Sequence, residues 1–194
     1  MTRLTARTRA LAATALIALT PAIASAVPIV TNGGFETNSL AGWTSGGVFT
    51  TTSSPVDSGS YAGNSGCVTV GLTHCVTIGA NGVAGDGSIS QTINLAPGVY
   101  RLTYAQDNAS ASGPNEFAVS LGNNVLRDTV NSTTTGYVDY AHVSAVSGGL
   151  TTLAFAIRQD PGQQYLDTIA LTMIDDGEGN NIGAVSQASA FQNT

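Results

Sequence analysis

Lysine is absent from this sequence, and its few basic residues are all arginines. The chain has 6 of them against 12 acidic residues, which gives a formal net charge of −6 at pH 7. Arg3, Arg7 and Arg9 lie at the very start, so the rest of the chain has three positive charges against 12 negative ones, or −9. Because such a surface repels phosphate groups and anionic lipid, we expect neither nucleic acid nor a membrane surface as a partner.

Sequence motifs of the common enzyme classes are also missing. There is no G-x-S-x-G, H-E-x-x-H, P-loop or G-x-G-x-x-G motif. The two histidines, His74 and His142, lack a sequence context that would support a catalytic triad. A glycoside hydrolase needs two carboxylates about 5–10 Å apart, a distance that a sequence does not reveal. We therefore predict that this protein is not an enzyme.

Long apolar runs are confined to the N-terminus. Residues 10–24 are largely apolar, follow the three N-terminal arginines and lead to Ala24-Ser25-Ala26, a small-x-small cleavage site. We expect residues 1–26 to be a signal peptide, so that the secreted protein, extracellular or periplasmic, begins at Val27. A retained N-terminal anchor is the alternative, although the run is short for a membrane span. No apolar stretch of about 20 residues follows, so we expect no span after signal removal.

The remaining chain has the pattern of a β-sandwich. Apolar residues recur with a period of two, as in Tyr100, Leu102 and Tyr104, and turn residues such as Ala96-Pro97-Gly98 and Gly122-Asn123-Asn124 interrupt the pattern at short intervals. This predicts one all-β domain over residues 27–174. Residues 175–194 have no periodic apolar face and several acidic residues, so we expect a disordered acidic tail.

Only two cysteines are present, Cys67 and Cys75, and Gly71 lies midway between them. A tight hairpin centred on Gly71 would place the two cysteines directly opposite each other, within disulfide distance. An even number of cysteines in an exported chain also favours a disulfide. Metal binding by both cysteines and His74 is the alternative, but structural zinc sites have four ligands and no fourth lies nearby.

Three short motifs resemble a known family. They are N-G-G-F-E followed by G-W in residues 32–43, I-S-Q-T-I and P-G-V-Y-R-L-T-Y in residues 89–104, and Y-L-D-T-I-A-L-T in residues 165–172. They resemble secreted bacterial jelly-roll β-sandwiches of the galactose-binding-like superfamily, which include carbohydrate-binding modules and PEP-CTERM-type exported proteins. The chain lacks the P-E-P tripeptide, C-terminal membrane helix and basic tail of the latter type. The resemblance implies a jelly-roll sandwich of two antiparallel sheets, galactose-binding-domain-like.

The same resemblance implies a structural calcium ion near the first and last strands. Its ligands would be Glu36 of the F-E motif and Asp167, the aspartate that opens the last strand. The composition agrees with this expectation, because a partly buried carboxylate needs a cation or N–H donors and arginines are scarce here. The alternative is that backbone N–H groups satisfy both carboxylates.

We expect a ligand site in the loop spanning residues 159–165. It combines amides, a carboxylate and an aromatic ring, a mixture that suits the hydroxyls and C–H faces of a sugar. Asn108 and Asn115 of a second polar loop would lie beside it if the two loops share an edge. The predicted ligand-binding residues are Gln159, Asp160, Gln164, Tyr165, Asn108 and Asn115.

We therefore predict a non-catalytic module that binds a polysaccharide or a cell-surface glycan. The alternative is a structural or adhesive protein of the cell envelope or matrix without a small-molecule site. In that case Tyr165 packs against the tail, and the amide side chains of the loop only form hydrogen bonds with the backbone of the turn. The aromatic residues distinguish the two hypotheses, because a sugar site exposes two or more on one face whereas a structural module buries nearly all of them.

Overall fold

The computed structural model describes residues 28–47, 56–57, 74–79, 86–108, 113–134, 136–160 and 162–177. In these residues the chain forms ten strands in two five-stranded sheets. The first sheet has the order β1 (Thr44–Gly47), β4 (Gly87–Leu95), β9 (Gly149–Gln159), β6 (Asn115–Leu121) and β7 (Asn124–Val130). The second has the order β2 (Val56–Asp57), β3 (Cys75–Gly79), β10 (Gln163–Asp175), β5 (Gly98–Asp107) and β8 (Val138–Val146).

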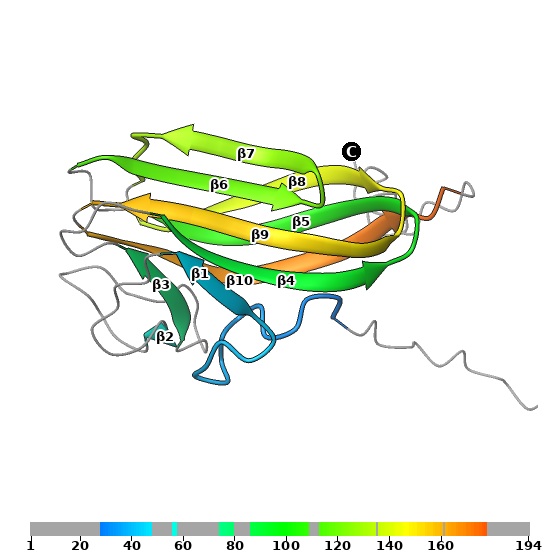
Figure 1. Ribbon diagram of the computed structural model, residues 1–194, viewed down its shortest axis with the longest axis horizontal. Coiled ribbons are helices and arrows are strands. Elements are labelled where there is room, and N and C mark those ends of the chain that lie inside the picture. The colour runs from blue at the N-terminus through cyan, green and yellow to red at the C-terminus, as the bar shows by residue number, and fades with distance from the viewer. Residues whose placement is uncertain are drawn as a thin grey trace, which may run out of the picture.

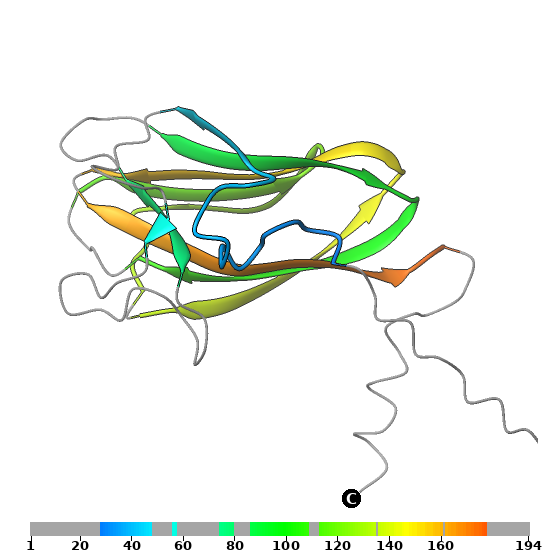
Figure 2. The same cartoon turned by 90° about the horizontal axis from the view of Figure 1, so that it is seen from below.

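All strand pairs are antiparallel, and the two sheets face each other in a sandwich (Figures 1 and 2). The predicted fold class, an all-β jelly-roll sandwich of two antiparallel sheets, is therefore confirmed. Within the described residues no helix is long and apolar enough to cross a bilayer. β10 continues to Asp175, one residue into the predicted tail, and Asp175 pairs with Val99. The predicted signal peptide and residues 178–194 lie outside the described residues.

The core consists of the inward-facing residues of both sheets, as the period of two predicts. β6 alternates between buried and half-buried residues along its whole length. Aromatic rings from both sheets meet in the centre, where the Phe155 ring lies 5.4 Å from Tyr104 and 6.2 Å from Trp43. Each such ring contributes a few kcal/mol when it is buried, about 25 cal/mol per Å² of apolar surface. The core therefore accounts for the cohesion of the two sheets.

The N-terminal N-G-G-F motif closes the sandwich against the last strand. The Ile169 amide donates to the Gly33 carbonyl at 2.9 Å, next to an irregularity in the pairing of β10 with β5. A Cβ atom on Gly33 would overlap the Ile169 carbonyl oxygen, so only glycine fits there. Trp43 Nε1 donates to the Asn32 carbonyl at 3.1 Å, and the Trp43 ring lies 5.9 Å from Phe35. The motif thus has a packing role.

Cys75 is fully buried at the start of β3. The β2–β3 register places Asp57 opposite Cys75, where the predicted hairpin would have placed Cys67. Cys67 and Gly71 lie outside the described residues, so the disulfide itself stays a prediction.

Candidate binding site at the turn end of the sandwich

The side chains predicted to bind a ligand are buried. Gln159 and Gln164 have no exposed surface, and Tyr165, Asn108 and Asn115 are 3%, 2% and 3% exposed. Asp160 is half-buried beside Arg158, at 3.8 Å between Oδ2 and the guanidinium. These residues do gather at one end of the sandwich, where β9 ends and β10 begins, but they do not project from it. Their burial differs from the exposure expected of loop side chains, and their role in ligand binding stays a prediction.

A network of polar side chains joins the two sheets at this end. Gln164 of the second sheet donates through Nε2 to the backbone carbonyls of Arg158 and Glu116 in the first, at 2.9 and 3.2 Å. Gln106 Nε2 donates to Gln164 Oε1 at 2.8 Å, and Arg127 in turn donates to Gln106 Oε1 at 2.6 Å. Because buried amides need such partners, Gln164 acts as a cross-link between the sheets.

Asn108 and Asn115 hold the turn that follows β7. The Ser132 amide donates to Asn115 Oδ1 at 3.0 Å, and the Asn131 amide donates to the Asn115 carbonyl at 2.8 Å. The Asn108 amide donates to Thr134 Oγ1 at 2.7 Å, and Asn108 Nδ2 donates to the Ser132 carbonyl. The side chains of Asn108 and Asn115 thus form hydrogen bonds with the backbone of this turn.

The two carboxylates predicted to bind calcium both accept backbone N–H groups. The His74 amide donates to Glu36 Oε1 at 3.0 Å, and His74 Nδ1 lies 3.5 Å from Oε2. The Thr168 amide donates to Asp167 Oδ1 at 2.6 Å. The described part of the chain has no group of three or more His, Cys, Asp or Glu residues that could hold a metal ion. Calcium therefore stays a prediction.

A cluster of rings and one guanidinium closes the side of the sandwich between the edge strands β7 and β8. The Arg127 guanidinium lies 3.8 Å from the centre of the Tyr140 ring and donates to its hydroxyl at 3.1 Å. Tyr104 stacks on Tyr140 and His142, and its hydroxyl lies 3.1 Å from His142 Nε2. Burial raises the pKa of Tyr104 to about 12 against the opposing effect of Arg127. Burial, assisted by Arg127, lowers the pKa of His142.

The sequence pattern did not reveal this cluster, because its members come from three separate strands. Tyr104 lies on β5, Arg127 on β7, and Tyr140 and His142 on β8. The one signal in the sequence was the scarcity of cations, which makes each arginine a candidate for a specific contact.

Tyr137 lies next to two buried aspartates at the start of β8. Burial first, and then the negative charges of Asp167 and Asp107, raise the pKa of its hydroxyl. Asp107 faces Tyr165 across β5 and β10 in the register of the second sheet. The phenol therefore remains protonated, and hence a hydrogen-bond donor, throughout the physiological pH range.

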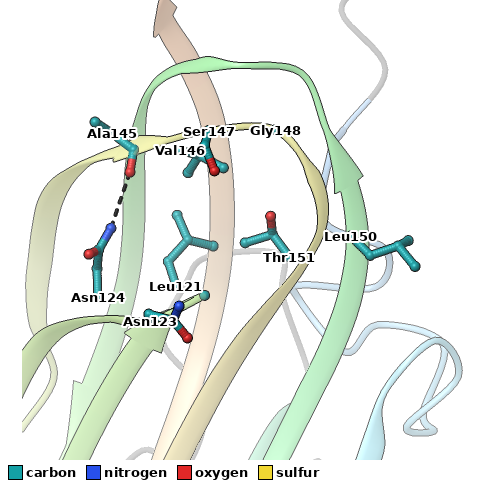
Figure 3. A pocket seen from close by; sticks show the side chains of 10 residues that line it. Leu121, Asn123, Asn124, Ala145, Val146, Ser147, Gly148, Leu150 and Thr151 are labelled. Atoms are coloured by element: carbon teal, nitrogen blue, oxygen red, sulfur yellow. Dashed lines mark hydrogen bonds between the residues drawn. The ribbon is translucent and has the colours of Figure 1, made fainter.

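A pocket of about 610 Å³ lies at the opposite end of the sandwich (Figure 3). We call it the turn-end pocket. It is lined by Leu121, Gly122, Asn123, Asn124, Ala145, Val146, Ser147, Gly148, Leu150 and Thr151. β9 runs from the pocket to Gln159 of the predicted site. Because a strand rises 3.3–3.4 Å per residue, the pocket and the predicted site are about 30 Å apart.

Glycines at two turns give the pocket its shape. Gly122, between β6 and β7, has a φ of 59° and donates to the Thr152 carbonyl at 2.8 Å. Gly148, between β8 and β9, has a φ of 89°, and a Cβ atom there would lie 2.9 Å from Pro97 Cδ. Both backbone conformations favour glycine. The β8–β9 turn therefore packs against the β4–β5 turn and faces the β6–β7 turn across the pocket.

The lining of the turn-end pocket has no charged side chain. It combines polar residues with Leu121 and Val146, which we call the floor of the pocket. Leu121 and Val146 point toward each other between the two turns, whereas Leu150 points away (Figure 3). Asn124 Nδ2 donates to Ser144 Oγ and to the Ala145 carbonyl, at 2.9 and 3.1 Å. The exposed side chains of Asn123 and Ser147 make no hydrogen bond within the described residues. They are therefore available to a ligand.

A second hollow of about 380 Å³ lies on the outer face of the second sheet. Thr103, Asp139, Ala141 and Thr168 line it together with parts of Tyr104 and Tyr140. It is smaller than the turn-end pocket and has a carboxylate at its edge. It offers an internal control for experiments on the turn-end pocket.

The chain matches no protein-family model and no curated protein sequence. Its fold is similar to that of solved structures. One is the carbohydrate-binding module TmCBM61 in complex with β-1,4-galactotriose, with a TM-score of 0.58 and 17% identity over 76% of this chain and 99% of that one. Another is the enzymatically active domain of tailspike protein 4 from bacteriophage CBA120. It has a TM-score of 0.55 and 15% identity, and the match covers 76% of this chain but 21% of that one.

A third similar structure, with a TM-score of 0.49 and 18% identity, is the K3 cleaved adhesin domain of Lys-gingipain from Porphyromonas gingivalis, covering 74% of this chain and 98% of that one. At such identities a likeness shows the fold and no more. The chain has a fold like that of carbohydrate-binding modules, which agrees with the family that its motifs resemble. Because a phage tailspike enzyme contains a similar sandwich, the function must be argued from the site.

Proposed function

We propose that this protein is a non-catalytic glycan-binding module that holds an uncharged saccharide in the turn-end pocket. The observation that carries the proposal is the pocket itself, about 610 Å³ between two turns, with amide, hydroxyl and backbone groups and no charged side chain. A pocket of this size accommodates a small oligosaccharide. The similar module TmCBM61 was solved with such a ligand, β-1,4-galactotriose.

The chemistry of the lining suits a neutral sugar. Amide and hydroxyl groups each offer donors and acceptors, which match the hydroxyl groups of a saccharide. Val146, which is half-buried, provides an apolar surface for its C–H groups beside the buried Leu121. An uncharged ligand also meets no repulsion from a protein with excess negative charge. Secretion is part of the proposal and depends on the predicted signal peptide at residues 1–26.

The proposal is tested by titrating the full secreted chain with neutral oligosaccharides, β-1,4-galactotriose among them, while amide NMR shifts are recorded. We expect the largest shifts at Asn123, Ser147 and Gly148. Asn123→Ala should weaken binding about five- to tenfold, since a hydrogen bond contributes about 1 kcal/mol. Thr103→Ala in the second hollow should leave the affinity unchanged. Shifts confined to that hollow, or equal effects of the two variants, would contradict the proposal.

A structural or adhesive protein remains the second candidate, and one observation favours it. Every described aromatic residue is buried except Tyr137 and Tyr140, which are half-buried. Phe49, Tyr61 and Phe191 lie outside the described residues. A site for stacked sugars would expose such rings. If no saccharide binds, and the protein instead sediments with cell envelopes, the result supports the structural hypothesis over the glycan-binding one.

A further inference from the structure

We infer that the turn-end pocket selects a saccharide that carries an acetamido group, so that its ligands are N-acetylated sugars. This inference rests on the proposed function and specifies the ligand class of the same site. An acetamido group combines a methyl group with one N–H donor and one carbonyl acceptor. The pocket presents a partner for each of these three parts.

The apolar floor is the partner for the methyl group. Leu121 ends β6 in the first sheet and Val146 ends β8 in the second, and their side chains approach each other between the two turns (Figure 3). Leu121 is 1% exposed, and Val146 is half-buried and packs against the core. A sugar hydroxyl that entered this place would lose hydration without a polar partner. A methyl group in this place instead raises the affinity of the ligand about fourfold, because one apolar carbon atom is buried.

The two turns are the partners for the amide. A secondary amide is planar and trans, so its N–H and its carbonyl point in opposite directions. Asn123 belongs to the β6–β7 turn and Ser147 to the β8–β9 turn, on opposite sides of the floor (Figure 3). Asn123 Nδ2 is placed to donate to the acetamido carbonyl, and Ser147 Oγ to accept from its N–H. Both side chains are exposed and make no hydrogen bond within the described residues.

The absence of charge in the lining excludes two related ligand classes. Neither an arginine nor an acidic residue lines the turn-end pocket, so it has no partner for the carboxylate of an acidic sugar or the ammonium of a free amino sugar. Acetylation converts that ammonium into a neutral amide. The pocket therefore distinguishes the acetylated sugar from the amino sugar by charge, and from the plain sugar by the methyl and amide contacts.

The test compares two ligands that differ only at this group. The full chain is titrated calorimetrically with the β-1,4-linked trimer of N-acetylglucosamine and with the β-1,4-linked trimer of glucose. We expect the acetylated trimer to bind at least about tenfold more tightly, since the methyl contact and the amide hydrogen bonds both contribute. The Val146 methyl signals should shift only with the acetylated trimer.

Matched variants test the assignment of contacts. Val146→Thr keeps the shape of the side chain but adds a hydroxyl group to the floor, so it should reduce the preference to about threefold or less. Val143→Thr makes the same change on the exposed outer part of β8 and should leave the preference unchanged. Ser147→Ala alters an exposed residue, so it tests the amide contact without a risk to folding.

The possible outcomes separate the inference from the function on which it rests. If both trimers bind equally, or if galactotriose binds and the acetylated trimer does not, the acetamido inference is wrong and the glycan-binding function stands. If no saccharide binds, both are wrong. A preference that survives Val146→Thr and Ser147→Ala together would also overturn the inference.

Discussion

At the scale of single residues, Gly33 is the clearest case of a residue fixed by its surroundings. Gly33 and Gly34 are adjacent in the N-G-G-F-E motif, and sequence alone treats them as equivalent turn residues. The structure separates them, because a side chain on Gly33 would overlap the Ile169 carbonyl oxygen, whereas on Gly34 its nearest neighbour would be Glu36 Cγ at 3.9 Å. The first must stay glycine and the second need not.

We predict that Gly33→Ala lowers the free energy of unfolding by about 2–3 kcal/mol, because backbone must shift to relieve the overlap. Gly34→Ala should change it by no more than about 0.5 kcal/mol. Urea unfolding of the two variants measures both values. Equal stabilities would show that the N-terminal motif does not pack against β10 as described.

A second prediction at this scale concerns pH. The pKa of His142 is lowered in the folded state by burial and by Arg127, so the folded protein resists protonation more than the unfolded chain does. The unfolded chain then binds more protons below its own pKa of about 6.5. The contribution of His142 to the free energy of unfolding is therefore fully present above about pH 6.5. It is lost as the pH drops toward the lower pKa of the folded state.

Melting temperatures between pH 7.5 and pH 5.5 test this expectation. They should fall with pH in the native protein, and the slope should be smaller in His142→Gln, whose side chain keeps a polar group but does not titrate in this range. This window lies above the ordinary pKa values of aspartate and glutamate. Parallel curves for the two proteins would contradict the assignment.

At the scale of the elements, the edge strands β7 and β8 need a device that holds them together. They belong to different sheets and share no backbone pairing in the described structure. Arg127 provides the link, with its guanidinium over Tyr140 and hydrogen bonds to Tyr140 and Gln106. Asn124 adds hydrogen bonds to Ser144 and Ala145 near the turn-end pocket.

We predict that Arg127→Lys destabilises the protein by about 1–2 kcal/mol although it preserves the charge. A lysine ammonium cannot reproduce the planar stack and the two directed hydrogen bonds. Arg101→Lys on the exposed part of β5 should have an effect below about 0.5 kcal/mol. Denaturant unfolding of both variants gives the comparison. If Arg127→Lys were as stable as Arg101→Lys, the link between the edge strands would have to come from other contacts.

At the scale of the whole molecule, the sandwich is completed where the N-terminal segment meets the last strand. Glu36 is bound to His74, next to the start of β3, and Asp167 lies on β10, the neighbour of β3. A hard cation held by the two carboxylates would reinforce this closure, since it binds the native state and not the unfolded chain. The backbone N–H groups that donate to both carboxylates offer the competing explanation.

We predict that calcium raises the melting temperature and that chelation lowers it. Saturation at 100 times the dissociation constant would add about 2.7 kcal/mol to the stability. Glu36→Gln should remove the calcium dependence, while Glu116→Gln on β6 should retain it. If protein shown to be free of calcium by elemental analysis melts as before, the backbone N–H groups alone satisfy the two carboxylates.

Local patterns in the sequence are sufficient to predict the sandwich. The alternation of Tyr100, Leu102 and Tyr104 predicts a strand with one buried face, because side-chain direction in a strand depends only on local geometry. The turns at Ala96-Pro97-Gly98 and Gly122-Asn123-Asn124 were predicted for the same reason, since glycine, proline and asparagine favour turns within a few residues. Both features are present in the structure.

Which polar residues face solvent depends on the packing of strands that are distant in the sequence. Gln159, Gln164 and Tyr165 have the composition of a binding loop, yet they are buried, because the two sheets meet around them. Asn123 and Ser147 are ordinary turn residues in the sequence, yet they face each other across a pocket, because β6 and β8 from different sheets end at the same place. The order and register of strands distant in sequence set these positions, and no local pattern of residues encodes them.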